Sequence, residues 1–416
     1  MNKVLILGAC GGIGSVATRA LLTSDLVDSL VLSDYNQPLL EKFCEELSDA
    51  RVSACSLDVN DQASLKNSIQ ECDVVVNCVG PFYKYGPPIL RAAIEVGRDY
   101  VDICDDLDAT IAQLELDEMA KEKSVRAIIG MGSSPGLANL LVRFANDTLL
   151  DQVEEVDICH VHGGEASEGP AVLKHRIHAM VNEVPVFVDG KFENVMLLEE
   201  SGARYSSEVD FGEVGVHKVY PYPHPETITL PKYIPNIRKV TNRGSIFPKQ
   251  YFELTMSHVR NGLASTQPIV VDGTEVVPLE FMVSHLISSR SKLLSDAGVI
   301  SPAGCLRVEV SGKKDGEDHT YIFLSGSSSD GAGAGTGIPA ALGAMLILDG
   351  KVTKTGVNPP EAVVDPVDMM AKAGSVVAKL GVATQTTKDQ LGGSKIPLTI
   401  EHLGPNSLRE FIPFEI

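Results

Sequence analysis

The first chemical signal in the chain is a string of glycines that follows an apolar run. The run KVLILG (3–8) leads into glycines whose spacing fits both GxxGxxG and GxxxGxG. Glycine at these places permits a tight turn and close approach of a pyrophosphate, and the helix that follows offers the positive end of its dipole. The residues expected to hold a dinucleotide here are Gly8, Gly11, Gly12, Ile13 and Gly14.

Asp34 supports a dinucleotide ligand and indicates which one. It ends the second apolar run, SLVLSD (29–34), 20 residues after Gly14. A carboxylate at this position accepts hydrogen bonds from the ribose hydroxyls of NAD and repels the 2′-phosphate of NADP. No Arg or Lys follows in SDYNQP (33–38) to bind that phosphate. We therefore expect NAD as the cofactor, and the alternative is a glycine turn with no ligand.

The ends of two further apolar runs are expected at the same edge of the sheet. The run VSACSLDV (52–59) ends in Asp58 and Val59, and this carboxylate either contacts the adenine or caps the next helix. The run DVVVNCVG (73–80) ends beside the expected dinucleotide. Its cofactor-binding candidates are Val79, Gly80 and Pro81.

The stretch PFYKY (81–85) raises the question of whether a Tyr–Lys pair performs the chemistry. Short-chain dehydrogenases use Tyr-x-x-x-Lys on one helix face, and none of the ten tyrosines here has Lys four residues later. Adjacent residues on a loop do not share a face. We therefore interpret the stretch as a loop in which Tyr83 and Tyr85 wall a substrate pocket and Lys84 is solvated.

Charge and cysteine content exclude several classes of function. The 416 residues carry a formal net charge of −20, which repels phosphate backbones, so nucleic acid is not expected as a partner. The eight cysteines include no CxxC pair, which is typical of free thiols in a reducing compartment. We find no signal-peptide pattern and no apolar stretch of about 18 residues, so we expect a cytoplasmic protein without membrane association.

The hydrophobic pattern predicts an α/β scaffold for these residues. Residues 1–135 alternate apolar runs with periodic helical segments, which predicts a parallel sheet with right-handed crossovers, a Rossmann-type domain. Residues 136–325 contain alternating strands and many prolines, which predicts an α+β domain for substrate binding and dimerisation. A glycine-rich run (325–337) and an apolar helix then return residues 326–416 to the first domain.

Three motifs resemble the saccharopine dehydrogenase-like family, which includes bacterial lysine 6-dehydrogenases. They are VGPFYKYGPPILRAAIEVGRDYVDICDD (79–106), GSSPGLAN (132–139) and TGIPAALGAMLILDGKV (336–352). The resemblance implies an N-terminal Rossmann domain that binds NAD(P), and a middle domain that closes the substrate cleft and forms a homodimer. It also implies an amino acid or polyamine substrate that is oxidised at a carbon bearing nitrogen. The saccharopine-forming reductases carry a basic residue near the position of Asp34, and this chain does not.

Hydride can leave a C–N carbon only when the amine is neutral, so the site needs a group that accepts a proton. Asp102 matches the strand-end aspartate of the family and is expected to hold a substrate ammonium group. The catalytic candidates are therefore Asp102, Tyr83 and His178. Asp106, like Asp105, either contacts substrate or caps the helix that begins near Leu107.

Further substrate-binding candidates lie in the second half of the chain. His175, Arg176 and His178 share the helical pattern AVLKHRIHAMV (171–181), and Arg176 could grip a carboxylate. The stiff loop YPYPHPETITLP (220–231) carries His224 and Glu226, and Arg243 is another possible carboxylate ligand. His160 and His162 alternate on a strand, but no carboxylate or thiol completes a recognisable metal set, so no metal is expected.

Together these features predict an NAD-dependent oxidoreductase that acts on the C–N bond of a small amino acid, with lysine as the first substrate considered. The alternative within the family is a saccharopine or carboxynorspermidine type of reductase, which joins an amine to a carbonyl. A third possibility, from another class, is an NAD-binding regulatory protein without turnover.

Overall fold

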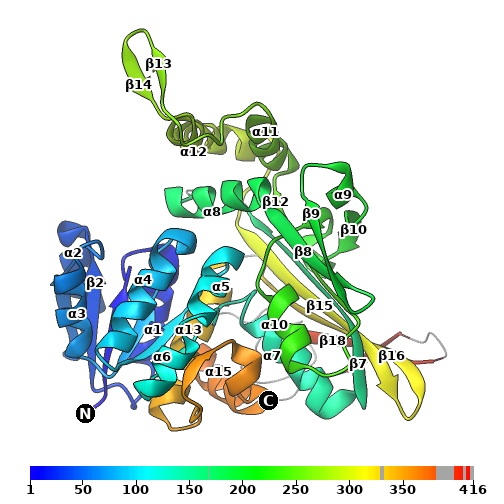
Figure 1. The fold of residues 1–416 in the computed structure, drawn as a ribbon, viewed down its shortest axis with the longest axis horizontal. Helices are drawn as coiled ribbons and strands as arrows, with labels where there is room; N and C mark the ends of the chain where they lie inside the picture. The colour runs from blue at the N-terminus through cyan, green and yellow to red at the C-terminus, as the bar shows by residue number, and fades with distance from the viewer. Residues whose placement is uncertain (167, 328–331, 381–397, 406–408, 413–416) are drawn as a thin grey trace. The chain divides into compact units, whose positions relative to one another are not determined.

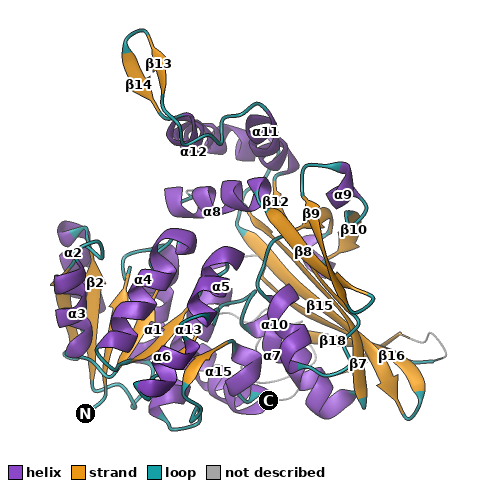
Figure 2. Cartoon of the chain, viewed as in Figure 1, coloured by secondary structure: helices purple, strands orange, loops and turns teal. Residues whose placement is uncertain are grey.

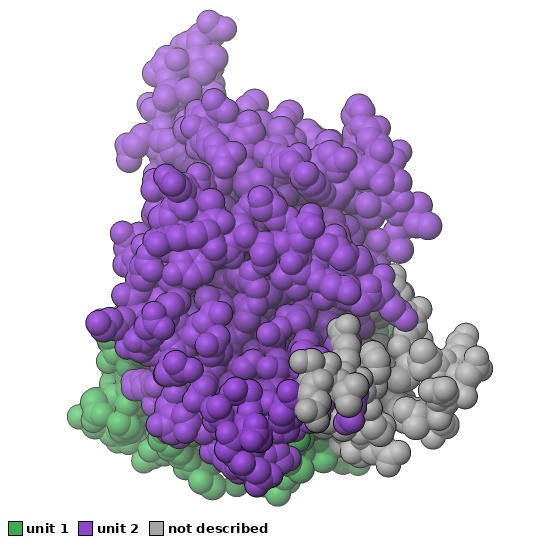
Figure 3. Space-filling view, turned by 90° about the vertical axis from the view of Figure 1, so that its right-hand side faces the viewer, with its two compact units in different colours: residues 1–150, 333–398, 413–416 green, residues 151–332, 399–412 purple. Residues whose placement is uncertain are grey.

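The structure is a computed structural model that describes residues 1–166, 168–327, 332–380, 398–405 and 409–412. The chain forms two compact units, coloured separately in Figure 3. The first comprises residues 1–150, 333–398 and 413–416, and the second comprises residues 151–332 and 399–412. The boundaries expected at 135 and 325 therefore differ from those of the units, because the helix after residue 135 packs its Leu140 into the core of the first unit.

A seven-stranded sheet forms the centre of the first unit, with the order β17-β6-β5-β4-β1-β2-β3 (Figure 1). Its strands pair in parallel throughout the described residues. The strands are β1 (Lys3–Leu7), β2 (Ser29–Asp34), β3 (Val52–Ser56), β4 (Val74–Asn77), β5 (Asp99–Asp102), β6 (Arg126–Ile128) and β17 (Gly356–Asn358). Six of these match the predicted apolar runs, whereas β17 was not predicted.

Helices cover both faces of this sheet. They are α1 (Gly12–Leu22), α2 (Gln37–Leu47), α3 (Gln62–Gln70), α4 (Phe82–Glu95), α5 (Leu107–Leu114), α6 (Asp117–Glu122), α7 (Leu137–Phe144), the π-helix η1 (Ala145–Leu149), α13 (Ala332–Leu348), α14 (Pro360–Val363) and α15 (Pro366–Leu380). One apolar core joins strand residues such as Ile6 and Val76 to α1, α2, α13 and α15. A second core joins Leu5 and Val75 to α3, α4 and α6. Because successive strand residues point to opposite faces, near-continuous apolar strands are buried on both sides.

A ten-stranded mixed sheet forms the second unit, with the path β10-β11-β12-β7-β15-β16-β18-β19 and with β8 and β9 joined at β12 (Figure 2). The strands are β7 (Gln152–Gly163), β8 (Glu183–Val188), β9 (Lys191–Met196), β10 (Ser207–Asp210), β11 (Val216–Pro221), β12 (Lys239–Phe247), β15 (Ala303–Lys314), β16 (Glu317–Ser327), β18 (Leu398–Leu403) and β19 (Arg409–Ile412). The central pair, β7 and β12, is parallel, and β7 pairs antiparallel with β15.

The remaining elements of the second unit are its helices and one hairpin. The helices are α8 (Pro170–Val181), α9 (Glu200–Ala203), the 3-10 helix η2 (Gly212–Val214), α10 (Glu226–Tyr233), α11 (Lys249–Arg260) and α12 (Pro278–Asp296), and the hairpin is β13 (Ile269–Val271) with β14 (Thr274–Val276). Helices α8, α11 and α12 share an apolar core with Tyr222 and Ile246. Within the described part of the chain, no helix combines the length and the apolar character needed to cross a bilayer.

Candidate functional site

The glycine loop between β1 and α1 has the geometry of a phosphate cradle. Gly8 has a φ of 76°, in the left-handed region that favours glycine, and a Cβ atom on Gly14 would lie 2.1 Å from the Gly8 carbonyl oxygen. On the open side, Gly11 and Gly12 are exposed, and no atom lies within 4 Å of the place where a Cβ of Gly12 would stand. Backbone N–H groups at the start of α1 are therefore accessible to a pyrophosphate, so these residues fit a dinucleotide.

Asp34 lies at the end of β2, beside the glycine loop. Its Oδ2 accepts a hydrogen bond from the Cys10 backbone N–H (3.2 Å), and its Oδ1 accepts one from the Asn36 backbone N–H (3.1 Å). A carboxylate has about four acceptor positions, so these two bonds leave capacity for ribose hydroxyls. The carboxylate is thereby fixed next to the loop that fits the pyrophosphate.

Cys10 is a residue of this loop that the sequence did not single out. Burial, together with the neighbouring carboxylate of Asp34, raises the pKa of the Cys10 thiol to about 12. The side chain is therefore a neutral thiol at physiological pH, and it adds no negative charge beside the expected pyrophosphate.

The other expected cofactor residues lie after β3 and β4, whose carboxyl ends are at the same edge as that of β1. Asp58 is exposed, and its Oδ1 accepts hydrogen bonds from the backbone N–H (2.9 Å) and the side chain (2.7 Å) of Asn60. The helix cap that was considered for Asp58 is instead Asp61, which accepts the Ala63 and Ser64 N–H groups. Asp58 therefore stays a candidate for adenine contact. Val59 packs against the apolar core.

Val79, Gly80 and Pro81 connect β4 to α4. The Cγ2 atom of Val79 lies 3.3 Å from the place where a Cβ of Gly8 would stand, so this connection abuts the glycine loop. Asn77 holds it in place, because its Oδ1 accepts the Val79 backbone N–H (3.0 Å). The cofactor candidates at the ends of β1, β2 and β4 are thus brought together by the parallel sheet, as open α/β sheets do at their ligand-binding edge.

Asp102 belongs to a buried hydrogen-bond network rather than to an open site, which corrects the expected surroundings of this residue. Its side chain is fully buried. Its Oδ1 accepts the backbone N–H groups of Cys104 (3.0 Å) and Gly130 (2.8 Å), while its Oδ2 accepts Tyr100 Oη–H (2.9 Å) and Gln113 Nε2–H (2.6 Å). Burial raises the pKa of Asp102, and these four hydrogen bonds oppose the rise.

The same network reaches the expected cofactor edge. Asn77 Nδ2 donates to Tyr100 Oη (2.9 Å), and Tyr100 donates in turn to Asp102. Asn77, Tyr100 and Gln113 were not predicted; the available signal is a polar residue at the end of an otherwise apolar run. Because the side chain is fully buried and already accepts four hydrogen bonds, we propose a positioning role for Asp102 in place of direct contact with a substrate ammonium group.

The PFYKY stretch is helical, not a loop as expected, because α4 begins at Phe82. Asp106 Oδ2 accepts the Tyr83 backbone N–H (2.9 Å) in the first turn of α4, although Asp106 itself stands at the N-cap position of α5. The carboxylate therefore satisfies a free N–H at the start of a neighbouring helix. Tyr85 packs partly against the apolar core, with Lys84 Nζ 4.7 Å from its ring centroid. The pocket roles of Tyr83 and Tyr85 stay predictions.

Helix α13 begins at the glycine loop of α1. A Cβ on Gly333 would lie 3.7 Å from the Gly12 carbonyl oxygen, and a Cβ on Gly337 would lie 2.8 Å from the Ile13 carbonyl oxygen. The helix was expected from residue 338 but starts at Ala332, so part of the glycine-rich run is helical. The expected glycine-rich run (325–337) also includes residues 328–331, which lie outside the described residues.

In the second unit, two of the expected substrate-binding residues, His175 and His224, belong to a cluster of rings. His224 and His175 lie with their ring centroids 6.1 Å apart, and both approach Tyr222, at 5.1 and 6.0 Å. His160 on β7 stacks on His224 at 4.9 Å. His160 was considered only as a metal ligand, and Tyr222 was not considered. The register of β7 against β12 brings these residues together, and the sequence alone does not show that register. His178, expected to be catalytic, is partly exposed near the end of α8 and stays a prediction.

Arg176, expected to grip a substrate carboxylate, is instead buried in an ion pair of the protein itself. It donates to both carboxylate oxygens of Glu168, which also accepts hydrogen bonds from Arg290 (3.1 Å) and Tyr251 (2.9 Å). Burial alone would raise the pKa of Glu168, but these guanidinium groups hold it at about 2. Arg176 is therefore neutralised by Glu168, and the expectation is corrected.

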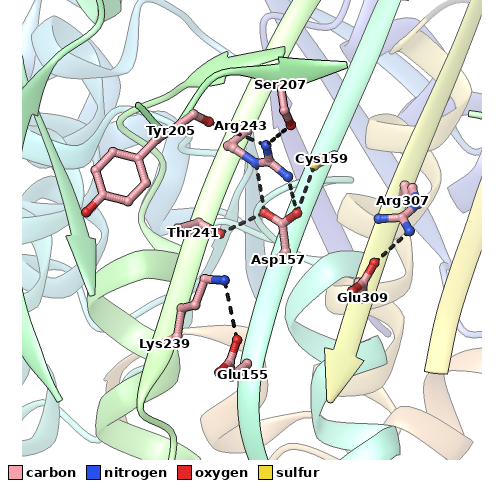
Figure 4. Close-up of polar contacts among 10 residues, drawn as sticks. All are labelled: Glu155, Asp157, Cys159, Tyr205, Ser207, Lys239, Thr241, Arg243, Arg307 and Glu309. Carbon is pink, nitrogen blue, oxygen red and sulfur yellow. Dashed lines mark hydrogen bonds and ion pairs between the residues drawn. The ribbon is translucent and has the colours of Figure 1, made fainter. Parts of the chain in front are cut away.

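Arg243 points to the opposite face of the second sheet from its neighbour Asn242, since side chains alternate along a strand. Its Nε donates to Asp157 Oδ1 (3.0 Å), a second nitrogen donates to Asp157 Oδ2, and Nη1 donates to Ser207 (2.5 Å), as Figure 4 shows. Thr241 also donates to Asp157 (2.7 Å). Arg243 was expected to bind a substrate carboxylate. Asp157 already binds its guanidinium group in a bidentate arrangement, so this expectation is corrected too.

The fold and the first unit define the class of protein: an oxidoreductase of the Rossmann type, with a parallel sheet and a glycine loop that fits a pyridine dinucleotide. Comparison with known proteins agrees. Residues 4–128 match the family model of the saccharopine dehydrogenase NADP binding domain, and residues 172–376 match that of the saccharopine dehydrogenase C-terminal domain.

Two relatives resemble the chain over nearly its full length. Carboxyaminopropylagmatine dehydrogenase of Synechocystis sp. is 23% identical, covering 90% of this chain and 96% of its own. Carboxynorspermidine synthase of Vibrio alginolyticus is 25% identical, covering 85% and 90%. The solved structure of apo saccharopine dehydrogenase (L-Glu forming) from Saccharomyces cerevisiae has the same fold, with a TM-score of 0.63 at 17% identity over 92% of this chain and 98% of that one.

The chain therefore belongs to the saccharopine dehydrogenase family, as its motifs indicated, and it is a dehydrogenase of that family. The predicted fold class is confirmed. A pyridine nucleotide is its cofactor, and the choice between NAD and NADP stays open at this point.

Proposed function

We propose that this enzyme makes or breaks a secondary C–N bond between a polyamine nitrogen and the carbon chain of a carboxylated partner. The observation that carries the proposal is the near full-length similarity to the two named relatives, since both names denote a polyamine that bears a carboxyl group. This reaction was the alternative prediction from the sequence, and it takes precedence over lysine deamination because these relatives span 90% and 85% of the chain.

In the reductive direction the amine condenses with a carbonyl group, water leaves, and hydride adds to the imine carbon while a proton adds to nitrogen. The bound nicotinamide supplies or takes up the hydride. The residues of the chain bind and orient the cofactor: Gly12 and Ile13, in the first turn of α1, offer backbone N–H groups to the pyrophosphate, Asp34 accepts the ribose hydroxyls, and Val79–Pro81 borders the nicotinamide side. We propose NAD over NADP because Asp34 is a carboxylate at the end of β2, held beside the glycine loop, and a carboxylate there would repel a 2′-phosphate.

Oxidative deamination of lysine to an imine or semialdehyde is the second candidate. The observation that favours it is again Asp34, because the saccharopine-forming reductases that this chain resembles carry a basic residue there. Both candidates use the same cofactor site and differ in whether the nitrogen leaves as ammonia or stays joined to a second carbon chain.

A turnover experiment separates the candidates. Purified protein is given NAD with lysine in one arm, and NADH or NADPH with 1,4-diaminobutane or agmatine and an amino acid semialdehyde in the other. Change in nicotinamide absorbance, followed by mass spectrometry of the product, is the readout. We expect a secondary amine in the second arm. Turnover of lysine alone, with no amine–carbonyl condensation, would overturn the proposal in favour of the second candidate.

A further inference from the structure

Four aromatic or imidazole rings in the second unit form a compact box. His160 and His224 are stacked, with centroids 4.9 Å apart and an interplanar angle of 9°. Tyr222 meets both rings edge-on, at 5.4 Å and 85° to His160 and at 5.1 Å and 88° to His224. His175 from α8 lies 6.0 and 6.1 Å from Tyr222 and His224. We call these four residues the ring box.

Local sequence explains why the box forms. His160 on β7 is directly opposite Gly244 on β12, and a Cβ on Gly244 would lie 2.1 Å from His160 Cε1. The ring therefore occupies the space above a strand that only glycine leaves open. Tyr222 is held by its backbone N–H, which donates to the Asn242 carbonyl oxygen (2.9 Å), and the His224 N–H donates to the Tyr222 carbonyl oxygen (2.8 Å).

A buried carboxylate lies behind the box. Glu226 is fully buried at the first position of α10, where the helix dipole stabilises negative charge. Its Oε1 accepts Asn242 Nδ2–H (3.2 Å), Asn242 Oδ1 lies 3.2 Å from His160 Nε2, and Glu226 Oε2 lies 3.8 Å from His224 Nδ1. One acidic group is thus linked to both stacked imidazoles.

The imidazoles of His160 and His224 carry no positive charge that would repel a cation. Burial lowers the pKa of His160 to about 3 and lowers that of His224 well below its ordinary value, helped by the neighbouring histidines. Both rings are therefore neutral at physiological pH. Arg176 interacts electrostatically with Tyr222, but its positive charge is balanced by the ion pair with Glu168. Within the second unit, Glu226 is thus the acidic group linked to the box.

We infer that the ring box binds an ammonium group of the amine substrate. Aromatic faces and neutral imidazole nitrogens attract an alkylammonium ion, and a buried carboxylate behind them adds Coulomb attraction in a low-dielectric setting. Glu226 acts through His224 and Asn242 as a positioning residue. This inference rests on the proposed function, because the ammonium group belongs to the polyamine that we propose as substrate.

The test is calorimetric titration of the full-length protein with 1,4-diaminobutane, and with 1,4-butanediol as the uncharged probe. We expect the diamine to bind and the diol not to bind. Glu226→Gln should weaken diamine affinity at least tenfold and raise the KM for the amine with a smaller change in kcat, while Glu226→Asp restores part of both. Glu275→Gln, on the exposed hairpin strand β14, is the matched control and should bind like the unchanged protein.

A second measurement does not depend on the folding of the Glu226 variant. In protein with isotope-labelled histidine, 1,4-diaminobutane should shift the ring resonances of His160 and His224, assigned by His160→Gln and His224→Gln, and leave that of His217 in place. Unmoved box resonances together with unchanged diamine affinity in Glu226→Gln would overturn the inference. If the diamine shifts the box resonances but no amine–carbonyl turnover occurs, the proposed function fails while the subsite stands. If amine–carbonyl turnover occurs but Glu226→Gln leaves the KM for the amine unchanged, the subsite fails while the proposed function stands.

Discussion

The carboxylate of Asp34 and the backbone N–H of Cys10 are joined by a hydrogen bond of 3.2 Å, so the end of β2 is tied to the glycine loop of β1. The carboxylate that we propose selects the ribose is thereby fixed to the loop that we propose binds the pyrophosphate. A substitution at residue 34 changes the charge at the ribose and also removes this tie.

Replacing Asp34 with Ser should shift cofactor preference toward NADP. Loss of the negative charge removes the repulsion of the 2′-phosphate, so we expect the ratio of kcat/KM for NADPH over NADH to rise by about tenfold or more. Steady-state kinetics with both reduced cofactors measures this ratio. Glu45→Gln, an exposed residue of α2, is the control for a general change in charge. An unchanged ratio in Asp34→Ser would remove our reason for naming NAD.

Asp102→Asn should destabilise the protein even though it removes a buried charge. The carboxylate accepts four hydrogen bonds, and an amide nitrogen in its place would face donors. Each buried donor left without an acceptor costs about 1–3 kcal/mol, so we expect a loss of that order in the free energy of unfolding. Denaturant unfolding gives this value.

The positioning role of Asp102 adds a second readout. Because the network reaches Val79 through Tyr100 and Asn77, Asp102→Asn and Tyr100→Phe should both weaken dinucleotide binding, measured by fluorescence titration with NADH. Gln113→Ala removes one donor to Asp102 and leaves the bonds from Asp102 through Tyr100 and Asn77 to Val79 in place, so it is expected to affect stability more than binding. Unchanged NADH affinity in a folded Tyr100→Phe protein would contradict the role.

Glu168 should make stability depend on acid pH. Its folded pKa of about 2 lies below the ordinary value of 4.5, so its contribution is fully present above pH 4.5 and is lost as pH falls toward 2. A fall in pKa of this size corresponds to about 3 kcal/mol at most. Urea unfolding between pH 6 and pH 3 measures the first part of this loss, about 2 kcal/mol, because the folded carboxylate is still mostly ionised at pH 3. Arg176→Met should reduce stability near neutral pH and flatten this dependence; an unchanged profile in the variant would assign the acid effect to other carboxylates.

Gly337→Ala should disturb the contact between α13 and α1. The added methyl group would lie 2.8 Å from the Ile13 carbonyl oxygen and from Val16 Cβ, so the helices must separate, at a cost of about 1–3 kcal/mol. Gly374→Ala in α15 is the matched control, because no atom lies within 4 Å of the place where its Cβ would stand and alanine favours helix by up to about 1 kcal/mol. Thermal unfolding should shift in opposite directions for the two variants.

The sequence predicted features that depend on local pattern. The strand, glycine turn and Asp34 lie within one βαβ unit, and the structure places them at one edge of the sheet. Features that depend on long-range partners were not predictable. An arginine such as Arg176 can bind a carboxylate of the substrate or of the protein. That its partner is Glu168 could be recognised only once the folded helix and the preceding loop were known.

The ring box shows the same limit at longer range. His160 and Gly244 are 84 residues apart, and only the parallel register of β7 on β12 places the ring over the glycine. Asp102 was expected at an open strand end because strand ends of parallel sheets carry ligands, but Gln113 and Gly130, on later segments, enclose it. Helix α4 began earlier than expected because Asp106 provides an acceptor for its first turn.

Strand β17 has a consequence for how the polypeptide is made. It pairs with β6, yet the ribosome must synthesise some 200 further residues after β6 before this edge of the sheet can be completed. A fragment that stops at Leu150 would leave β6 as a bare hydrophobic edge and would lack the apolar cover of α13 and α15. The nucleotide-binding half is therefore expected to resist proteolysis only in the complete chain, and expressing it alone should yield aggregates.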